Sequence, residues 1–522
     1  MKKAVPEKKV KSKKVLRKVA KILLVILYLL LLSISFILIF GTNWAISNYG
    51  FDSFNQILYT LNSSVTKAGS GVVEDFISSN VIIPIFIVLG FYIIYRIIKY
   101  IFRNSNFVWD IELFHKSISN IKLKKIGKFI FIIFPVVFLL FSAYYTMSKL
   151  YIFDYLISNS KTSDFIKLEY VAPEDVEFTF PNKKRNLIYI YLESMENTYA
   201  NKANGGAFDI NYMPELTQLA KENLSFSYTN KMGGAVPLYG TTWTTGALVA
   251  STAGVPIKTS LDANSSEYYS QGVVDKVYSL GDILKDNGYQ NYMMVGSDIE
   301  FGGRKTYLSS HGDYTMFDYN TAIDEGVIDE DYYVWWGLED YKLFNWAKDK
   351  LTEIASNDEP FNFTMLTVDT HAVGGYTSNL CEKKYDDSYL NSIACSSSQL
   401  GEFIEWIQEQ DFYKNTTVIL TGDHLSMNKA TFTDLDDDYM RTVYNVYLNP
   451  AIRTDCNTNR EFSTFDFFPT TLASLGVKID GNKLGLGTNL FSCKKTLSEI
   501  YGNKYINKNL PRKSTFYNKH IA

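Results

Sequence analysis

Three long apolar runs stand out in the first 147 residues of this 522-residue chain. Each approaches the ~20 residues that a helix needs to cross a bilayer, and none carries the polar stripe expected of a buried helix in a soluble protein. Arg96 and Lys99 lie near the end of the second run, where their long side chains can reach the membrane interface. The pattern predicts a transmembrane domain, residues 1–147, with three helices over about 22–40, 81–101 and 129–147.

Lysine and arginine are distributed unevenly around these runs. Residues 1–21 hold ten of them, residues 41–80 hold only Lys67, and residues 103–128 are basic again. Because positive charge is retained on the cytoplasmic side, we expect the N-terminus inside and everything after Met147 outside. The first run ends in Ile-Phe-Gly-Thr-Asn-Trp, without a small-residue cleavage site, which indicates an anchor and not a removed signal peptide.

Beyond residue 147 the pattern changes to short β-prone runs that alternate with helical ones. We expect a juxtamembrane connector over 148–185, an extracytoplasmic domain over 186–497 and a basic, solvated tail over 498–522. The predicted strands are Leu187–Leu192, Tyr292–Val295, Phe361–Val368 and Thr416–Leu420. The predicted helices between them are Met213–Asn223, Val277–Asn287, Tyr341–Ser356 and Ser397–Glu409. This alternation predicts an α/β fold, an α/β/α sandwich with a mostly parallel sheet.

Charge and cysteine content narrow the class of protein. The first 147 residues carry 19 Lys/Arg against 6 Asp/Glu, which leaves 33 against 49 for the rest and argues against a nucleic-acid partner. All four cysteines lie in the exported part, and an even number there predicts two disulfides with three possible connectivities. A zinc cluster is the rival, but the chain has no Cys-x-x-Cys spacing. We favour the short loop Cys381–Cys395, with Cys456–Cys493 as the second pair.

Ionisable side chains follow all four predicted strands. In open α/β sheets, ligands bind at the carboxyl ends of strands, because side chains from several strands converge there. One acidic strand end is usually a turn or a helix cap, whereas four together predict one crevice. The four segments are Glu193-Ser-Met-Glu196, Gly296-Ser-Asp298, Asp369-Thr-His371 and Gly422-Asp423-His424.

A glycine-rich loop, Gly233–Gly240, precedes a cluster of threonines and a small-residue helix. A threonine at that helix start is either a simple N-cap or a hydroxyl placed where a phosphoryl group binds well. With Thr244 as that hydroxyl, Glu193, Asp423 and His424 complete a set of three oxygens and one nitrogen, which suits Mn²⁺, Zn²⁺ or Mg²⁺. A divalent cation would make the hydroxyl a competent nucleophile.

Histidine is scarce, which limits the metal chemistry. Of five histidines, His115 is expected in the cytoplasm and His520 in the tail, so the site can hold about one metal and a two-metal site is disfavoured. His371 is then available to bind a phosphate or protonate a leaving group, with a structural histidine as the alternative. Arg304, in Phe-Gly-Gly-Arg, suits a phosphate, although a lone arginine is more often in a surface ion pair.

The order Leu-Glu193-Ser, Thr244, Phe-x-x-Arg304, Asp-Thr-His371 and Asp423-His424 resembles the membrane-anchored branch of the alkaline phosphatase and sulfatase superfamily. It is most similar to the phosphoglycerol transferases of periplasmic glucans, and next to the lipoteichoic acid synthases. The similarity extends over roughly residues 186–490 and is densest at 281–292, 367–371 and 421–428.

The resemblance implies a bacterial plasma-membrane enzyme whose four ligands, named above, hold one metal, with Mn²⁺ favoured. It implies that Thr244 takes a glycerophosphoryl group from phosphatidylglycerol, releases diacylglycerol, and passes the group to a cell-envelope glycan or polymer. Arg304 and His371 would hold the phosphate. The choice of Thr244 over its rivals rests on the resemblance; those rivals are Thr241, Thr242 and Thr245.

Two departures and three alternatives accompany this interpretation. Gly302 and Gly303 stand where the polyglycerolphosphate synthases carry a bulkier aromatic segment, so the donor pocket is expected to differ, and three spans replace the usual five. The alternatives are a phosphoethanolamine transferase, an anchored phosphodiesterase or sulfatase-type hydrolase, and a non-catalytic surface protein. Sulfatases mature a residue within Cys/Ser-x-Pro-x-Arg, and no such stretch occurs near Thr244.

Overall fold

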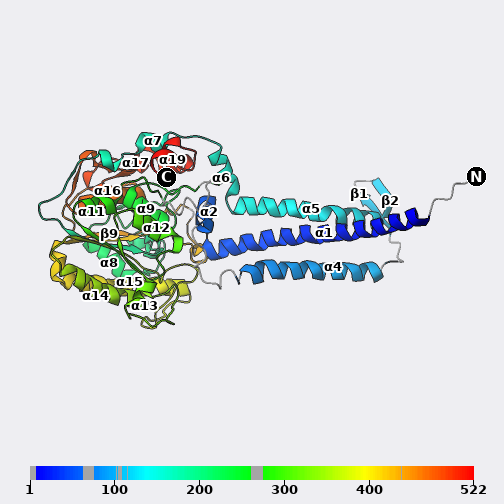
Figure 1. Ribbon diagram of the computed structural model, residues 1–522, viewed down its shortest axis with the longest axis horizontal. Helices are drawn as coiled ribbons and strands as arrows, with labels where there is room; N and C mark the ends of the chain where they lie inside the picture. Colours follow the sequence, from blue (N-terminus) through cyan, green and yellow to red (C-terminus); the bar gives the residue numbers. More distant parts are fainter. Residues whose placement is uncertain are drawn as a thin grey trace, which may run out of the picture. The chain divides into compact units, whose positions relative to one another are not determined.

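A computed structural model describes residues 7–62, 74, 76–101, 103, 108–113, 116–259, 261, 274–436 and 438–522. The chain forms two compact units (Figure 1): residues 1–47 with 69–153, and residues 48–68 with 154–522. The described residues 48–62 therefore belong to the second unit, although the sequence predicts them as part of a loop of the transmembrane domain. Lys67 and His115, used above for orientation and the histidine count, lie outside the described residues.

The first unit is built from long apolar helices. Among the described residues, three segments are long and apolar enough to cross a membrane: Lys14–Tyr49, Ser78–Ile101 and Ile132–Lys149. Several of these helices extend beyond the apolar runs, because lysines and arginines also have good helix propensity. The elements are α1 (Glu7–Tyr49), a π-helical turn (Ser78–Ile82), α4 (Ile83–Ile101), the hairpin strands β1 (Val108–Leu113) and β2 (Lys116–Lys122), and α5 (Leu123–Lys149).

A six-stranded sheet forms the centre of the second unit. Its strand order is β6-β5-β7-β4-β8-β9, and every neighbouring pair is parallel except β8 with β9. The mostly parallel sheet of the predicted α/β class is thereby confirmed. The strands are β4 (Asn186–Leu192), β5 (Gln290–Val295), β6 (Thr315–Phe317), β7 (Phe361–Leu366), β8 (Thr416–Gly422) and β9 (Asn445–Leu448).

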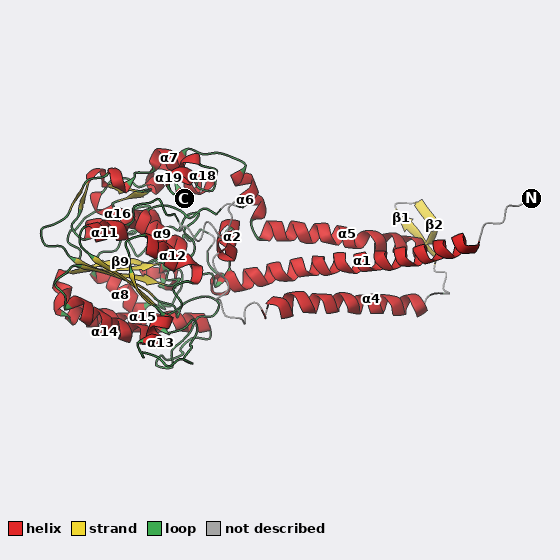
Figure 2. Cartoon of the chain, viewed as in Figure 1, coloured by secondary structure: helices red, strands yellow, loops and turns green. Residues whose placement is uncertain are grey.

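Helices cover both faces of this sheet (Figure 2). On one face lie α9 (Thr244–Ala253), α11 (Leu280–Asp286), α12 (Arg304–Ser310) and α16 (Phe467–Ser474). On the other lie α8 (Pro214–Glu222), α13 (Tyr319–Asp324), α14 (Asp340–Ala355) and α15 (Ser388–Glu409). Helix α15 begins nine residues before the predicted start, where the Asp387 side chain accepts a hydrogen bond from the Tyr389 N–H (2.8 Å).

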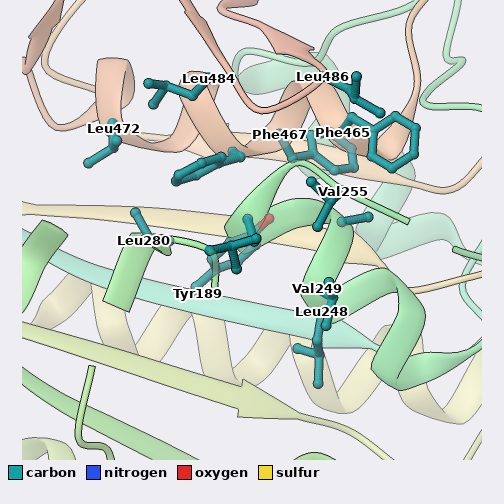
Figure 3. Packing of buried hydrophobic residues seen from close by; sticks show 14 of the residues in the cluster. Tyr189, Leu248, Val249, Val255, Leu280, Phe465, Phe467, Leu472, Leu484 and Leu486 are labelled. Carbon is teal, nitrogen blue, oxygen red and sulfur yellow. The ribbon is translucent and has the colours of Figure 1, made fainter. Parts of the chain in front are cut away.

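The central strand β4 explains why the core has two halves. Its side chains alternate between the faces, so that Tyr189 packs in one hydrophobic cluster and Ile188 and Ile190 in the other. Figure 3 shows Tyr189 among side chains of α9, α11 and α16. A strand buried on both faces needs apolar residues at consecutive positions, which accounts for the unbroken run that the sequence displays.

Segments on either side of the predicted domain also pack into the second unit. Strand β3 (Phe178–Thr179), within the expected connector, pairs with β10 (Lys478–Ile479).

Both favoured disulfides are confirmed, Cys381–Cys395 and Cys456–Cys493, each with a Cα–Cα distance of 5.5 Å. The other small elements are α2 (Phe54–Asn62), α6 (Ile152–Asn159), α7 (Phe165–Glu169), β11 (Lys483–Leu484) and β12 (Gly487–Thr488).

The C-terminal residues differ from the solvated tail expected from their lysines. They form α17 (Leu497–Tyr501), α18 (Asn503–Asn509) and α19 (Thr515–His520). Ile506, Leu510 and Tyr517 are almost completely buried, and the Tyr517 hydroxyl donates a hydrogen bond to the Pro256 carbonyl (2.7 Å). Apolar residues interleaved with the lysines anchor this segment to the unit.

Tyr517→Ala should therefore destabilise the second unit by about 3–5 kcal/mol, because it leaves a cavity and removes a buried hydrogen bond. Tyr505→Ala, a matched control in which the tyrosine is 49% exposed, should cost less than about 1 kcal/mol. Thermal unfolding of the full chain in detergent micelles measures both variants. Equal melting temperatures for the two would contradict the docked tail.

Candidate metal centre

The register of two parallel strands brings the first two candidate ligands together. Leu192 of β4 is paired with Gly422 of β8, so the next residues, Glu193 and Asp423, emerge side by side. The Asp423 N–H continues the ladder by donating to the Leu192 carbonyl (3.1 Å). Gly422 has no room for a side chain, since an added Cβ would lie 1.8 Å from the carbonyl oxygen of Met195.

The turn after β4 then fixes both carboxylates. Ser194 has a left-handed φ of 52°, an unusual conformation for a residue with a side chain. Its N–H donates to Asp423 Oδ1 (2.8 Å), and its hydroxyl donates to Glu193 Oε1 (2.7 Å). The Glu193 N–H donates to the hydroxyl of Thr367, just after β7 (2.9 Å). Three adjacent strands thus hold the carboxylates in place.

Helix α9 supplies the hydroxyl. Thr244 is its first residue, and the Thr244 Oγ1 lies 3.5 Å from Glu193 Oε2 and 3.5 Å from His424 Nε2. Two rival threonines have their hydroxyls engaged elsewhere: Thr241 bonds to the Leu238 backbone (2.9 Å), and Thr245 donates to the Gly302 carbonyl (2.7 Å). The geometry favours Thr244 over both.

Two carboxylates and an imidazole face the Thr244 hydroxyl at this point. His424 donates its Nδ1 proton to the Leu425 carbonyl (2.9 Å), so in the neutral ring its Nε2 presents a lone pair. That nitrogen lies 3.6 Å from Glu193 Oε1 and 3.4 Å from Asp423 Oδ2. Asp423 Oδ2 is buried, and no described residue donates a hydrogen bond to it. Carboxylate oxygens and a neutral imidazole nitrogen crowded in this way repel one another unless a proton or a cation lies between them.

The spacing of these atoms fits a single divalent ion. Four ligands placed tetrahedrally around zinc with bonds of about 2.1 Å are about 3.4 Å apart, close to the 3.4–3.6 Å separations here. The ligand atoms of Glu193, Asp423 and His424 all lie within 4.8 Å of one another. A carbonyl-bound Nδ1 is also typical of histidines that ligate a metal through Nε2. The residues therefore fit the implied metal.

The electrostatics of the centre agree with this. Burial and the neighbouring Glu193 raise the pKa of Asp423. Burial alone would raise the pKa of Glu193, yet His371, His424 and Ser194 together hold it below its usual range. Burial alone would lower the pKa of His424, but Asp423 and Glu193 raise it. Two buried carboxylates so close together either retain a proton or bind positive charge, and a divalent ion would supply that charge.

Arg304 is buried beside the centre, which argues against a surface ion pair. Its Nη2 donates to the Ser297 hydroxyl (2.9 Å) and to the Asp298 carbonyl (2.7 Å). Its Nε is buried and has no hydrogen-bond partner among the described residues. Burial lowers the pKa of Arg304 to about 10, so the guanidinium stays charged at neutral pH. An anion is the natural partner for this group.

His371 lies in contact with the ring of Trp336 (4.7 Å between ring centres). Its Nδ1 proton is donated to the Ala372 carbonyl (2.6 Å). Burial lowers the pKa of His371, so the ring is neutral at pH 7 and its Nε2 is an acceptor.

A cavity of about 100 Å³ joins these groups. It is lined by every predicted site residue except Asp423, which is almost completely buried. The sequence had not pointed to several other lining residues, because they carry no group that is charged at neutral pH: Phe51, Gln56, Tyr59, Trp243 and Trp336. Three hydroxyls hold the site residues in place. Thr367 lies at the end of a predicted strand, and Ser194 and Ser297 follow predicted strands; nothing else in the sequence indicated their role.

A family model described as Sulfatase matches residues 185–477. The chain belongs to the sulfatase family. This confirms the resemblance to the alkaline phosphatase and sulfatase superfamily. The sulfatase-family chain is 33% identical over 334 residues to a phosphoglycerol transferase I of Citrobacter koseri, an alignment that covers 62% of this chain and 41% of that protein. It thus spans less than half the length of this relative.

Two solved structures are also similar to this sulfatase-family chain. One is the lipoteichoic acid synthase LtaP from Listeria monocytogenes, with a TM-score of 0.46, 20% identity, and coverage of 63% of this chain and 80% of that one. The other is the lipooligosaccharide phosphoethanolamine transferase EptA from Neisseria meningitidis, with a TM-score of 0.46, 13% identity, and coverage of 87% and 84%.

Glu193→Gln and Asp423→Asn should each weaken binding of Mn²⁺ or Zn²⁺ at least 100-fold, because each removes a charged ligand. Asp411→Asn, which changes an aspartate whose side chain is 99% exposed, is the control and should bind like wild type. Elemental analysis after dialysis should find about one ion per chain in the wild type and control. Equal metal content in all four proteins would refute the site.

Metal affinity should also fall as the pH is lowered. A protonated carboxyl is a poor ligand, and the pKa of Asp423 is raised by burial and Glu193, so the loss should begin well above the usual range of an aspartate near pH 4. Binding should release protons near neutral pH, which calorimetry in buffers of different ionisation enthalpy detects. Affinity independent of pH from 5 to 8 would contradict this assignment.

Proposed function

We propose that this chain transfers a glycerophosphoryl group from phosphatidylglycerol to a hydroxyl of a cell-envelope glycan or polymer. Glu193, Thr244, Asp423 and His424 hold one divalent metal, with Mn²⁺ favoured and Zn²⁺ or Mg²⁺ as alternatives. The observation that carries this proposal is the position of the Thr244 hydroxyl, 3.5 Å from both Glu193 Oε2 and His424 Nε2 at the start of α9. The likeness to a phosphoglycerol transferase I supports the choice of head group.

Thr244 acts as the nucleophile. A divalent ion bound here would lower the pKa of the hydroxyl and offset negative charge at phosphorus. The Thr244 hydroxyl loses its proton to solvent and its oxygen forms a bond to the phosphorus of the lipid, while the bond from phosphorus to the diacylglycerol oxygen breaks. Diacylglycerol leaves after its oxygen takes up a proton, and the glycerophosphoryl group remains on Thr244. The first turn of α9 directs its backbone N–H groups and dipole toward the transferred group.

Arg304 binds the phosphoryl oxygens. Its Nη2 is fixed by Ser297 and Asp298, so the fork is already oriented before the substrate arrives. Because the guanidinium is desolvated by burial, the gain from pairing with an anion is larger than on the surface. This preorganisation lets Arg304 stabilise charge that grows at phosphorus in the transition state.

His371 binds the substrate through Nε2. In its neutral form this atom accepts a hydrogen bond, so it is suited to take the proton of the acceptor hydroxyl in the second step. That hydroxyl attacks phosphorus, the bond from phosphorus to Thr244 breaks, and the threonine hydroxyl is restored. When the ring carries a second proton, it can donate to a phosphate oxygen or to the departing diacylglycerol.

The membrane helices provide access to the lipid. We propose a multi-pass protein of the bacterial plasma membrane with a cytoplasmic N-terminus and an extracytoplasmic catalytic unit, supported by the three membrane-length helices and the basic N-terminal residues. Phosphoethanolamine transfer, or hydrolysis with water as the acceptor, are the nearest alternatives, because the same nucleophile and metal would serve them.

Incubation with phosphatidylglycerol and Mn²⁺ should leave wild-type protein with the added mass of one glycerophosphoryl group on Thr244. Thr244→Ala should abolish the adduct and lower diacylglycerol release by at least about 10³-fold, as expected for a lost nucleophile. Thr242→Ala, a neighbouring threonine outside the pocket, should behave like wild type. Intact-mass spectrometry and peptide mapping measure the adduct, and a fluorescent lipid measures release.

The outcomes separate the alternatives. A phosphoethanolamine adduct formed from phosphatidylethanolamine would replace the head group, and free glycerophosphate with every acceptor tested would indicate a hydrolase. Unchanged diacylglycerol release by Thr244→Ala would remove the proposed nucleophile.

A further inference from the structure

A short segment from outside the predicted domain forms part of the candidate pocket. Residues 48–62 precede the second membrane-length helix, yet they belong to the same compact unit as residues 154–522. Within them, α2 (Phe54–Asn62) contains no charged residue, and its Asn55, Gln56, Ile57 and Tyr59 are buried. We refer to residues 48–62 as the donor wall.

The donor wall is fixed by specific polar contacts. The Asn55 side-chain amide donates to the Ile257 carbonyl (2.9 Å) and accepts from the Thr259 N–H (2.7 Å). Both ends of that amide are therefore satisfied by the segment that follows α9. Such paired, buried hydrogen bonds hold an element in one orientation.

A second contact reaches residues close to Thr244 and Arg304 in the sequence. The Tyr59 hydroxyl donates to the Gly302 carbonyl (2.8 Å), which also accepts from the Thr245 hydroxyl (2.7 Å). The Tyr59 ring packs against Trp243 (5.3 Å between ring centres). The donor wall is thus coupled to the start of α9 and to the glycine turn before Arg304.

The cavity has two chemically different kinds of lining residue. Glu193, Thr244, Arg304, His371 and His424 are polar and carry the candidate chemistry. The donor wall contributes only uncharged residues, half of them aromatic: Asn48, Tyr49, Phe51, Gln56, Tyr59 and Thr60. A ligand with a phosphodiester at one end and apolar groups at the other matches both kinds of lining.

The size of the cavity limits what it encloses. At about 100 Å³ it is smaller than the roughly 300–1,000 Å³ of pockets that bury a drug-sized ligand. It can enclose a phosphate with its head group or the adjoining glycerol ester, but not two acyl chains. Selection for a lipid must then come from the atoms closest to the phosphate.

Gln56 offers one polar contact within the donor wall. It is 2% exposed and lines the cavity, and its Oε1 accepts the Asp52 N–H (3.1 Å). With that oxygen engaged, the amide NH₂ is the end suited to donate to an oxygen of the bound molecule.

We propose that residues 48–62 form the donor-binding wall of this site and select a phosphodiester carried on a diacylglycerol, through the ring of Phe51 and the amide of Gln56. This inference rests on the proposed function and deepens it, because it assigns recognition of the lipid donor to a segment outside the sulfatase-family match, which spans residues 185–477.

Full-length Phe51→Ala and Gln56→Ala in mixed micelles test the proposal with two donors, long-chain phosphatidylglycerol and the water-soluble p-nitrophenyl diester of glycerophosphate. The ratio of kcat/KM for the lipid to that for the soluble diester should fall about tenfold in each variant, the size expected for one lost apolar or polar contact. Leu61→Ala, on the same helix but 68% exposed and outside the cavity, should keep the wild-type ratio. Equal losses with both donors would indicate a structural role and overturn the proposal.

A second measurement is independent of turnover. A phosphatidylglycerol with a photoreactive group on its glycerol ester should label a peptide within residues 48–62 in wild-type protein, and labelling should fall in Gln56→Ala. Labelling confined to other segments overturns the donor wall even if transfer occurs. Labelling of the donor wall without transfer of its head group would instead count against the proposed function and leave the wall in place. Unchanged melting temperature and metal content of the variants exclude misfolding.

Discussion

Two buried carboxylates and an imidazole that face one another are the constraint on which this site depends. His424 Nε2 lies 3.6 Å from Glu193 Oε1 and 3.4 Å from Asp423 Oδ2, and all three side chains are almost completely buried. Their mutual repulsion would cost several kcal/mol if nothing offset it. A divalent ion bound there would remove that cost and make the same atoms a template that positions the Thr244 hydroxyl. The chemistry proposed for the protein follows from this single arrangement.

The sheet makes the arrangement possible. Parallel strands end at the same edge, and the pairing of Leu192 with Gly422 sets Glu193 and Asp423 next to each other without further adjustment. Thr367, at the end of the next strand, and the left-handed turn at Ser194 then hold the carboxylates in one orientation. Groups that orient metal ligands in this way usually affect metal affinity and activity strongly, as the ligands themselves do.

The sequence predicted the residues at the centre of the candidate site, but it did not predict the segments that surround them. The strand-end rule predicted that Glu193, His371, Asp423 and His424 lie together, because four strands that all end in ionisable residues are better explained by one crevice than by four separate turns. The sequence pattern alone could not decide among Thr241, Thr242, Thr244 and Thr245, since successive side chains near a helix start point in different directions. Only a resemblance, and then the geometry, distinguished Thr244.

Other features left little trace in the sequence. Strand β6 has three residues and β9 has four, too few for a periodic signal. The docked tail and the donor wall were missed because they contribute single buried side chains, such as Tyr517 and Tyr59, whose partners are more than 200 residues away. Contacts of that range depend on the complete fold.

Anomalous diffraction from crystals of the full chain loaded with Mn²⁺ tests the central claim most directly. The account predicts one ion, bonded at about 2.0–2.3 Å to Glu193, Thr244, Asp423 and His424. An ion bound elsewhere, or two ions sharing the pocket, would contradict it.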